Sequence, residues 1–288
     1  MTDDAHIQTL RRELDALLQE CDYAAHRAKD PVSLVWEYED PEDQSLIGLL
    51  ASGLAYGRVA LVRDAGRRAA TPLGSRPVVS LMNLSDDELQ GMYQGFVYRM
   101  TRGEDIVDLL CGVRAIYLDG GSIEQVYAQG GETHNERVIH LVETIRRGRL
   151  RPNLERGFRY LLPSPADKGA CKRLHLYLRW MGRGPDGVDL GTWKQLDPAD
   201  LLMPLDTHTA RICRYLGLSQ RKTVDAKMVH EVTQGLAQLD PVDPLKYDFP
   251  ICHLGISGGC IHTWSEDHCP SCPLNQVCVL AADSRASG

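Results

Sequence analysis

Four cysteines close to the C-terminus constrain this chain more than any other feature of its sequence. They follow the pattern C-x8-C-x2-C-x5-C and are Cys260, Cys269, Cys272 and Cys278. The short spacing between Cys269 and Cys272 lets two thiolates reach one metal centre from a single turn, and the outer cysteines can close the site from either side. Four thiolates on one loop suit a [4Fe–4S] cluster, which offers one iron to each ligand. We therefore expect a loop that folds around an iron–sulfur cluster.

Zinc, or no metal at all, stays open as an alternative for this loop. Structural zinc sites usually carry two short C-x2-4-C pairs, and this loop has one. Disulfides would require an oxidising compartment. The chain begins MTDDAHIQTLRREL, which is acidic and then amphipathic and unlike a secretory signal. No stretch approaches the roughly 20 apolar residues of a membrane span. We expect a cytoplasmic protein, associated with the nucleoid if the source is bacterial, whose thiols stay reduced.

Apolar periodicity predicts helices throughout the chain. Residues 5–28 show one apolar face, and SLIGLLASGLAY follows an Asp-Pro-Glu-Asp helix start at 40–43. An N-cap at Ser85 begins another helix, and further helices are expected near 103–118, 121–128 and 133–148. No segment shows sustained strand alternation. The sequence predicts an all-α protein with an ordinary globular composition, 43% hydrophobic and 25% charged.

A net charge of −7 argues mildly against a nucleic-acid partner, but a local basic face matters more than the total. Helical projection of residues 168–183 gives a basic stripe about 60° wide, with apolar side chains opposite. Its members are Lys168, Lys172, His175, Arg179 and Arg183. We expect the stripe to face outward, either as a DNA-binding surface or as the solvated face of a surface helix.

Asp206 stands at the start of a short helix in MPLDTHTARICRYLGL, residues 203–218. As an N-cap it would stabilise the helix by about 1 kcal/mol, which is a sufficient structural reason for an aspartate there. Backbone N–H groups at a helix N-terminus also keep a carboxylate ionised, as stabilisation of a cationic transition state requires. The two explanations are compatible.

These pieces together resemble the helix-hairpin-helix DNA glycosylases of the endonuclease III and adenine glycosylase type. The matching segments are LDTHTARICRYLGL at 205–218, HLGISGGC at 253–260 and CPSCPLNQVC at 269–278, with a weaker match in DQSLIGLLASGLAYGRV at 43–59. The resemblance implies a two-lobed fold with DNA between the lobes. Residues 43–200 would form a middle lobe, and residues 1–42 with 201–288 a cluster lobe. It also implies that Asp206 is catalytic and that the four cysteines are cluster ligands.

The activity that the resemblance implies is base excision from double-stranded DNA by a monomeric enzyme. A damaged or modified base would be flipped out of the duplex and its N-glycosidic bond hydrolysed. Asp206 would stabilise the oxocarbenium-like sugar and position the attacking water. Tyr56 and Trp180 are candidates for stacking on the flipped base, although both also fit ordinary core aromatics. Base specificity does not carry over.

The chain departs from the family pattern where a Gly-rich LPGVGxxTA turn would stand. Here the region reads RWMGRGPDGVDLGTWKQLDPADLLMPLD, in which Gly187 and Gly191 could form a divergent turn that binds phosphate through backbone N–H groups. The segment DGVDLGTW contains no lysine for Schiff-base chemistry, and Lys194 lies just beyond it. We therefore expect a monofunctional enzyme. A non-catalytic iron–sulfur nucleic-acid-binding protein and an iron–sulfur redox protein stay as alternatives.

Overall fold

The computed structural model describes residues 4–256 and 258–287, which divide into two compact units. The central unit is Tyr23–Asp197, and the terminal unit combines the residues up to Asp22 with those from Pro198 onward. The first boundary precedes the expected one at 42/43, because the 3-10 helix η1 (Pro31–Glu37) packs against helix α3 (Pro41–Gly53). Residues 1–3 of the expected 1–42 segment, and Ser257 of HLGISGGC, lie outside the described residues.

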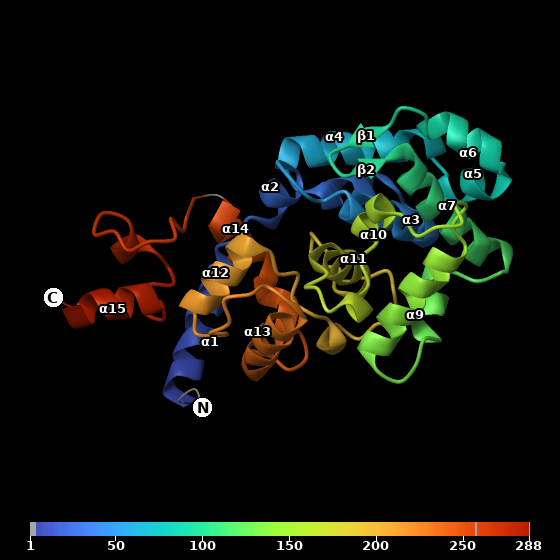
Figure 1. Ribbon diagram of the computed structural model, residues 1–288. Helices are drawn as coiled ribbons and strands as arrows, with labels where there is room; N and C mark the ends of the chain where they lie inside the picture. The colour runs from blue at the N-terminus through green and yellow to red at the C-terminus, as the bar shows by residue number, and fades with distance from the viewer. Residues whose placement is uncertain (1–3, 257, 288) are drawn as a thin grey trace. The chain divides into compact units, whose positions relative to one another are not determined.

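Helices dominate both units, which confirms the all-α expectation (Figure 1). The strands β1 (Val97–Tyr98) and β2 (Thr101–Arg102) form a small antiparallel hairpin, in which Val97 lies opposite Arg102 and Tyr98 opposite Thr101. The single helix expected over 5–28 is two helices, α1 (Asp4–Gln19) and α2 (Tyr23–Arg27). Within the described ranges, no helix combines the length and apolar character that crossing a bilayer demands.

The core of the central unit is built around α3, whose side chains are buried from Asp43 to Gly53. Asp40 caps the helix by accepting hydrogen bonds from the backbone N–H groups of Glu42 and Asp43. Helix α11 (Lys172–Gly182), helix α4 (Val59–Ala70) and helix α5 (Pro77–Asn83) pack against α3. The contact with α11 is close at Gly48, where a Cβ atom would lie 3.0 Å from Met181 Cε.

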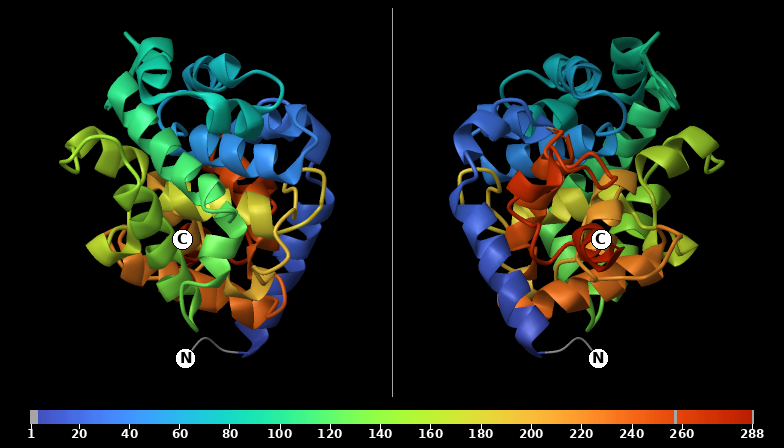
Figure 2. Two further views of the ribbon diagram at one scale, coloured as in Figure 1. Left: turned by 90° about the vertical axis from the view of Figure 1, so that its right-hand side faces the viewer. Right: turned by 90° about the vertical axis from the view of Figure 1, so that its left-hand side faces the viewer.

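A second group of helices surrounds α7 (Gly103–Leu118), and Figure 2 shows it from two further sides. Its neighbours are α6 (Asp86–Tyr93), α8 (Ile123–Ala128), α9 (His134–Arg147) and α10 (Arg156–Leu161). Helices α7 and α9 almost touch, because a Cβ atom at Gly112 would lie 2.1 Å from the carbonyl oxygen of Ile145. The 3-10 turns η2 (Thr71–Leu73) and η3 (Pro165–Asp167) complete the unit.

The terminal unit joins α1 to the C-terminal part of the chain. Its helices are α1, α12 (Thr207–Tyr215), α13 (Ala226–Leu239), α14 (Asp248–Ile256) and α15 (Val279–Ser287), with 3-10 turns η4 (Pro198–Asp200), η5 (Pro244–Tyr247) and η6 (Cys269–Ser271). Helix α1 packs on α13 and η5. The Tyr247 hydroxyl donates to Asp15 Oδ1 at 2.7 Å, and Lys246 Nζ lies 3.4 Å from the same oxygen. These contacts hold the first helix against residues more than 200 positions away.

Candidate functional site

Asp206 is the N-cap of α12, as the sequence predicts. Its backbone is extended (φ −112°, ψ −174°), and the side chain is half-buried. Oδ1 accepts hydrogen bonds from the backbone N–H groups of His208 and Thr209, both at 2.9 Å. The chain before it is anchored to α13, since Met203 N donates to Thr233 Oγ1 at 3.0 Å. The carboxylate therefore has a fixed direction at the positive end of a helix.

A second carboxylate belongs to the same part of the terminal unit. Asp248 begins α14 and is 2% exposed, and α14 packs on α12. The thiol of Cys213 has a raised pKa because it is buried, and the charges of Asp248 and Asp206 raise it further. Both carboxylates are therefore close enough to Cys213 to act on it electrostatically. The helices approach closely at Gly255, where a Cβ atom would lie 3.0 Å from Ile212 Cδ1.

The four cysteines of the loop are half-buried free thiols. Burial raises the pKa of Cys272, and the charges of Cys260, Cys278 and Cys269 raise it further. For Cys260 burial is again the main cause, with Cys278 and Cys269 adding to it. In residues 4–256 and 258–287, no three His, Cys, Asp or Glu side chains are already arranged as a metal site. The four sulfurs therefore lie near enough to one another for the charge of one thiol to influence the pKa of the next.

Backbone N–H groups point at three of these sulfurs. Ser265 N donates to Cys269 Sγ at 3.3 Å. The backbone N–H groups of His262 and Leu274 act in the same way on Cys260 and Cys272, where they oppose the rise in pKa. A neutral thiol is a weak acceptor, whereas thiolates bound to iron are held by such N–H donors. The loop backbone thus supplies hydrogen-bond donors to three of the four sulfurs.

His262 connects the cysteine loop to α12. Its Nε2 atom lies 3.4 Å from His208 Nδ1, and its Nδ1 atom lies 3.8 Å from Cys260 Sγ. Tyr215 at the end of α12 donates its hydroxyl hydrogen to the backbone oxygen of His262 at 3.2 Å. His262 has a left-handed backbone with φ 61°, which is uncommon outside glycine. The loop and the helix that carries Asp206 therefore form one local structure.

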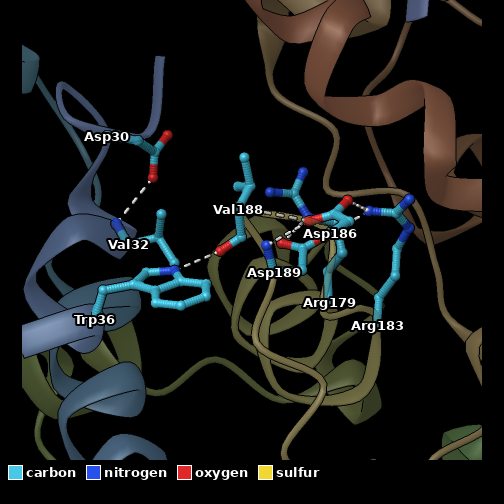
Figure 3. Close-up of polar contacts among 8 residues, drawn as sticks. All are labelled: Asp30, Val32, Trp36, Arg179, Arg183, Asp186, Val188 and Asp189. Carbon is cyan, nitrogen blue, oxygen red and sulfur yellow. Dashed lines mark hydrogen bonds and ion pairs between the residues drawn. The ribbon is translucent and has the colours of Figure 1, made fainter. Parts of the chain in front are cut away.

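The expectation that the basic stripe faces outward is wrong for its C-terminal half. His175, Arg179 and Arg183 are buried, at 4%, 2% and 7% exposure. Figure 3 shows the reason: Arg179 Nε lies 3.1 Å from Asp189 Oδ1, and Arg183 contacts both Asp186 and Asp189. These aspartates come from the turn that follows α11 and cover this side of the helix. Of the four proposed DNA-binding cations, only Lys168 is exposed, and Lys172 is half-buried.

The glycine-containing turn after α11 uses its N–H groups internally. Asp186 Oδ1 accepts from Val188 N and Asp189 N at 2.9 and 2.8 Å, and Gly191 N donates to the carbonyl oxygen of Trp180 at 3.3 Å. The outer edge of the turn is covered as well, because Trp36 Nε1 donates to Val188 O at 2.8 Å (Figure 3). Arg27 also donates to Gly187 O, at 2.7 Å. The phosphate-binding role expected for Gly187 and Gly191 has no support in this geometry.

The two proposed base-stacking residues differ in accessibility. Trp180 is fully buried, and its Nε1 atom has no hydrogen-bond partner in the part of the chain that the structure describes. It is a core residue, so the expectation that it stacks on a base is wrong. Tyr56 is half-buried, and its hydroxyl donates to the carbonyl oxygen of Tyr98 at 2.9 Å. Lys194 is exposed, and its Nζ donates to Gly191 O at 2.7 Å.

Sequence reasoning missed the two histidines that join the loop to the helix. His208 follows Asp206 by two residues and His262 follows Cys260 by two. Histidine next to a proposed ligand and a proposed catalytic residue is a usable signal, because imidazole serves as acid, base and ligand near neutral pH. Their pairing across more than 50 residues could not be read from the spacing.

Comparison with known proteins gives one family. A family model described as "Protein of unknown function (DUF2400)" matches residues 30–257. The matched range includes Asp206 and ends before Cys260, so the cysteine loop lies outside it. No glycosylase family model matches, and the assignment to the helix-hairpin-helix glycosylases is therefore wrong. No curated protein matches the chain.

Proposed function

This chain belongs to the DUF2400 family, which has no assigned function, and we propose from the geometry of the terminal unit that it hydrolyses N-glycosidic bonds of damaged or modified bases in DNA. Asp206 is the proposed catalytic carboxylate. Water is the proposed nucleophile, since the segment before Lys194 offers no lysine amine.

The observation that carries the proposal is the position of Asp206 beside the histidine pair. Breaking an N-glycosidic bond leaves positive charge on the sugar, and a carboxylate fixed by two backbone N–H bonds can stabilise that charge without reorganising. His208 follows directly on the capping turn and lies 3.4 Å from His262. An imidazole so placed can exchange a proton with water or with a departing base.

We propose that Cys260, Cys269, Cys272 and Cys278 hold a [4Fe–4S] cluster. The N–H donors directed at three of the sulfurs, and the position of all four half-buried thiols on one loop, support this donor set. A bound cluster would supply folding energy to the loop. His262 would then link the ordered loop to both ends of α12, to His208 in its first turn and to Tyr215 at its last residue.

The test is excision by Asp206→Asn on duplexes that contain oxidised, deaminated, alkylated or mismatched bases. Asparagine caps helices about as well as aspartate, so stability should change little. An amide cannot stabilise the cation, and we expect the rate to fall by about 10²–10⁴-fold while DNA binding survives. The matched control is Asp225→Asn, the same substitution at the N-cap of α13, which should keep full activity.

Retained excision by Asp206→Asn would refute the catalytic role. A wild-type protein that binds these duplexes and excises none of the bases would instead be a non-catalytic iron–sulfur DNA-binding protein.

A further inference from the structure

Three tyrosines and an arginine form a compact cluster in the central unit. The ring of Tyr56 lies 5.0 Å from that of Tyr98 and 4.9 Å from that of Tyr160, the latter in an edge-to-face arrangement. The guanidinium of Arg173 lies over two of the rings, 4.8 Å from the centroid of the central Tyr56 and 4.3 Å from that of Tyr160. These residues come from the segment after α3, the β1–β2 hairpin, α10 and α11; α11 packs on α3 and α10 packs on β2 (Figure 1).

Arg173 is a half-buried cation that is held in place by neutral groups. It donates to the carbonyl oxygens of Gly53 and Tyr160. It forms no ion pair with a carboxylate in the described parts of the chain. Buried arginines are almost always paired. Here two tyrosine rings and two carbonyl groups fix the guanidinium, and its positive charge is left without an anion.

A strained hairpin adds a second cation. Arg99 lies at the tip between β1 and β2 with a left-handed backbone, φ 53°, which is unfavourable for arginine. Tyr56 and Tyr98 fix this hairpin reciprocally, since each hydroxyl donates to the backbone oxygen of the other residue. The Arg99 guanidinium lies 5.9 Å from the Tyr56 ring, and its NH1 atom would be 3.0 Å from a Cβ atom at Gly57. The hairpin thus holds Arg99 against the tyrosine cluster.

The surface around the cluster is both apolar and basic. Tyr160 is 38% exposed and Met100, beside Arg99, is 43% exposed. The exposed arginines that adjoin the cluster along the chain are Arg58, Arg156 and Arg159. None of them, nor Arg99, has a carboxylate partner in the residues that the structure describes. Acidic residues outnumber basic ones in this chain, 39 to 32. A group of arginines without carboxylate partners therefore marks this surface as a candidate for binding an anion.

We propose that the surface formed by Tyr56, Arg99, Tyr160 and Arg173, the tyrosine–arginine platform, binds an unpaired segment of single-stranded DNA. Aromatic faces stack on any base and so bind single strands without regard to sequence. Guanidinium groups match phosphate geometry. The choice of DNA rests on the proposed function, and it makes the substrate a DNA that also exposes an unpaired stretch.

The experiment measures binding of the full chain to fluorescein-labelled 15-nucleotide oligo(dT) by anisotropy at several salt concentrations. Tyr160→Ala should weaken binding by roughly 5- to 100-fold, whereas Tyr160→Phe, which keeps the ring, should bind like wild type. Arg99→Gln should lower the slope of log K against log salt by about 0.7. The matched control is Arg147→Gln, because Arg147 is an exposed arginine on α9, which contributes no residue to the platform, and its replacement should leave the affinity and the slope unchanged.

A probe with the same sugar-phosphate backbone and no bases separates stacking from charge. Wild type should bind it about as weakly as Tyr160→Ala binds oligo(dT). Equal binding of the baseless and the normal probe would overturn the proposal, and so would tenfold tighter binding of oligo(rU) or unchanged binding by folded Tyr160→Ala. The binding experiment does not depend on Asp206. If the platform variants bind normally, the platform proposal fails and the excision assay still tests the proposed function. If the protein excises no base, the proposed function fails and the binding result still holds.

Discussion

Replacing Arg179 with alanine should destabilise the central unit by about 3 kcal/mol at pH 8. Arg179 and Asp189 are both buried, and their contact is 3.1 Å long. Removing one partner of a buried pair typically destabilises a protein by about 3–5 kcal/mol, because the other charge stays buried without compensation. The lower end applies here, since Arg183 still lies 2.9 Å from Asp189 Oδ2.

The effect should depend on pH. Burial raises the pKa of Asp189 to about 6, against the lowering influence of Arg179 and Arg183. The folded protein therefore keeps a proton that the unfolded chain has released, and its stability falls as the pH rises from about 4 to about 6. Loss of Arg179 removes a group that lowers this pKa. The pKa rises further, the fall in stability extends to higher pH, and the variant should be more destabilised at pH 8 than at pH 5.

The assay is urea unfolding at pH 5, 6 and 8 followed by tryptophan fluorescence, because Trp36, Trp180 and Trp193 all lie in the central unit. The control is Arg147→Ala, an exposed arginine on α9, which should change the free energy of unfolding by no more than about 0.5 kcal/mol. A loss below about 1 kcal/mol at pH 8, or an equal loss at all three pH values, would contradict the reasoning. A stable Arg179→Ala protein with impaired DNA binding would restore the surface role first expected for this residue.

Two further predictions concern the loop and the helix packing. Anaerobically purified protein should carry about four irons per chain, and Cys272→Ser should lower both iron content and soluble yield, as metal analysis will show; stoichiometric zinc without iron would contradict this. Gly112→Ala should destabilise the protein by at least about 1–3 kcal/mol in the same urea assay, because its Cβ atom would lie 2.1 Å from Ile145 O. Gly91→Ala, in α6 with no atom within 4 Å of the added Cβ, should instead stabilise by up to about 1 kcal/mol.

Local signals predicted the helices well. The caps at Asp40 and Ser85 are read from a few adjacent residues, and the structure has both. The same is true of Asp206, whose capping bonds involve only the next three residues. An N-cap forms hydrogen bonds only with residues that follow it closely, so the sequence alone can predict where a helix begins.

Contacts from outside a helix could not be predicted in the same way. Projection placed Arg179 and Arg183 on one face of α11, but it could not show that Asp186 and Asp189 fold back over that face. Trp180 was a stacking candidate because it is aromatic, and only the structure shows that it is fully buried, where no base can reach it. The N–H groups directed at the cysteine sulfurs depend on the loop backbone, which spacing does not determine. Short motifs likewise suggested the helix-hairpin-helix glycosylases, whereas the family model that matches residues 30–257 is DUF2400.

The terminal unit combines residues up to Asp22 with residues from Pro198 onward, so its two parts are synthesised at different times. Leu10, Leu14 and Leu17 of α1 are buried against helices that are made only after residue 226. At about 5–20 residues per second, α1 must wait roughly 10–40 s with its apolar face uncovered while the central unit is completed. During that interval α1 is a target for chaperones and for other nascent chains. The Cys260–Cys278 loop follows α13 and α14 in the chain, so the helices that cover α1 are made before the proposed cluster ligands.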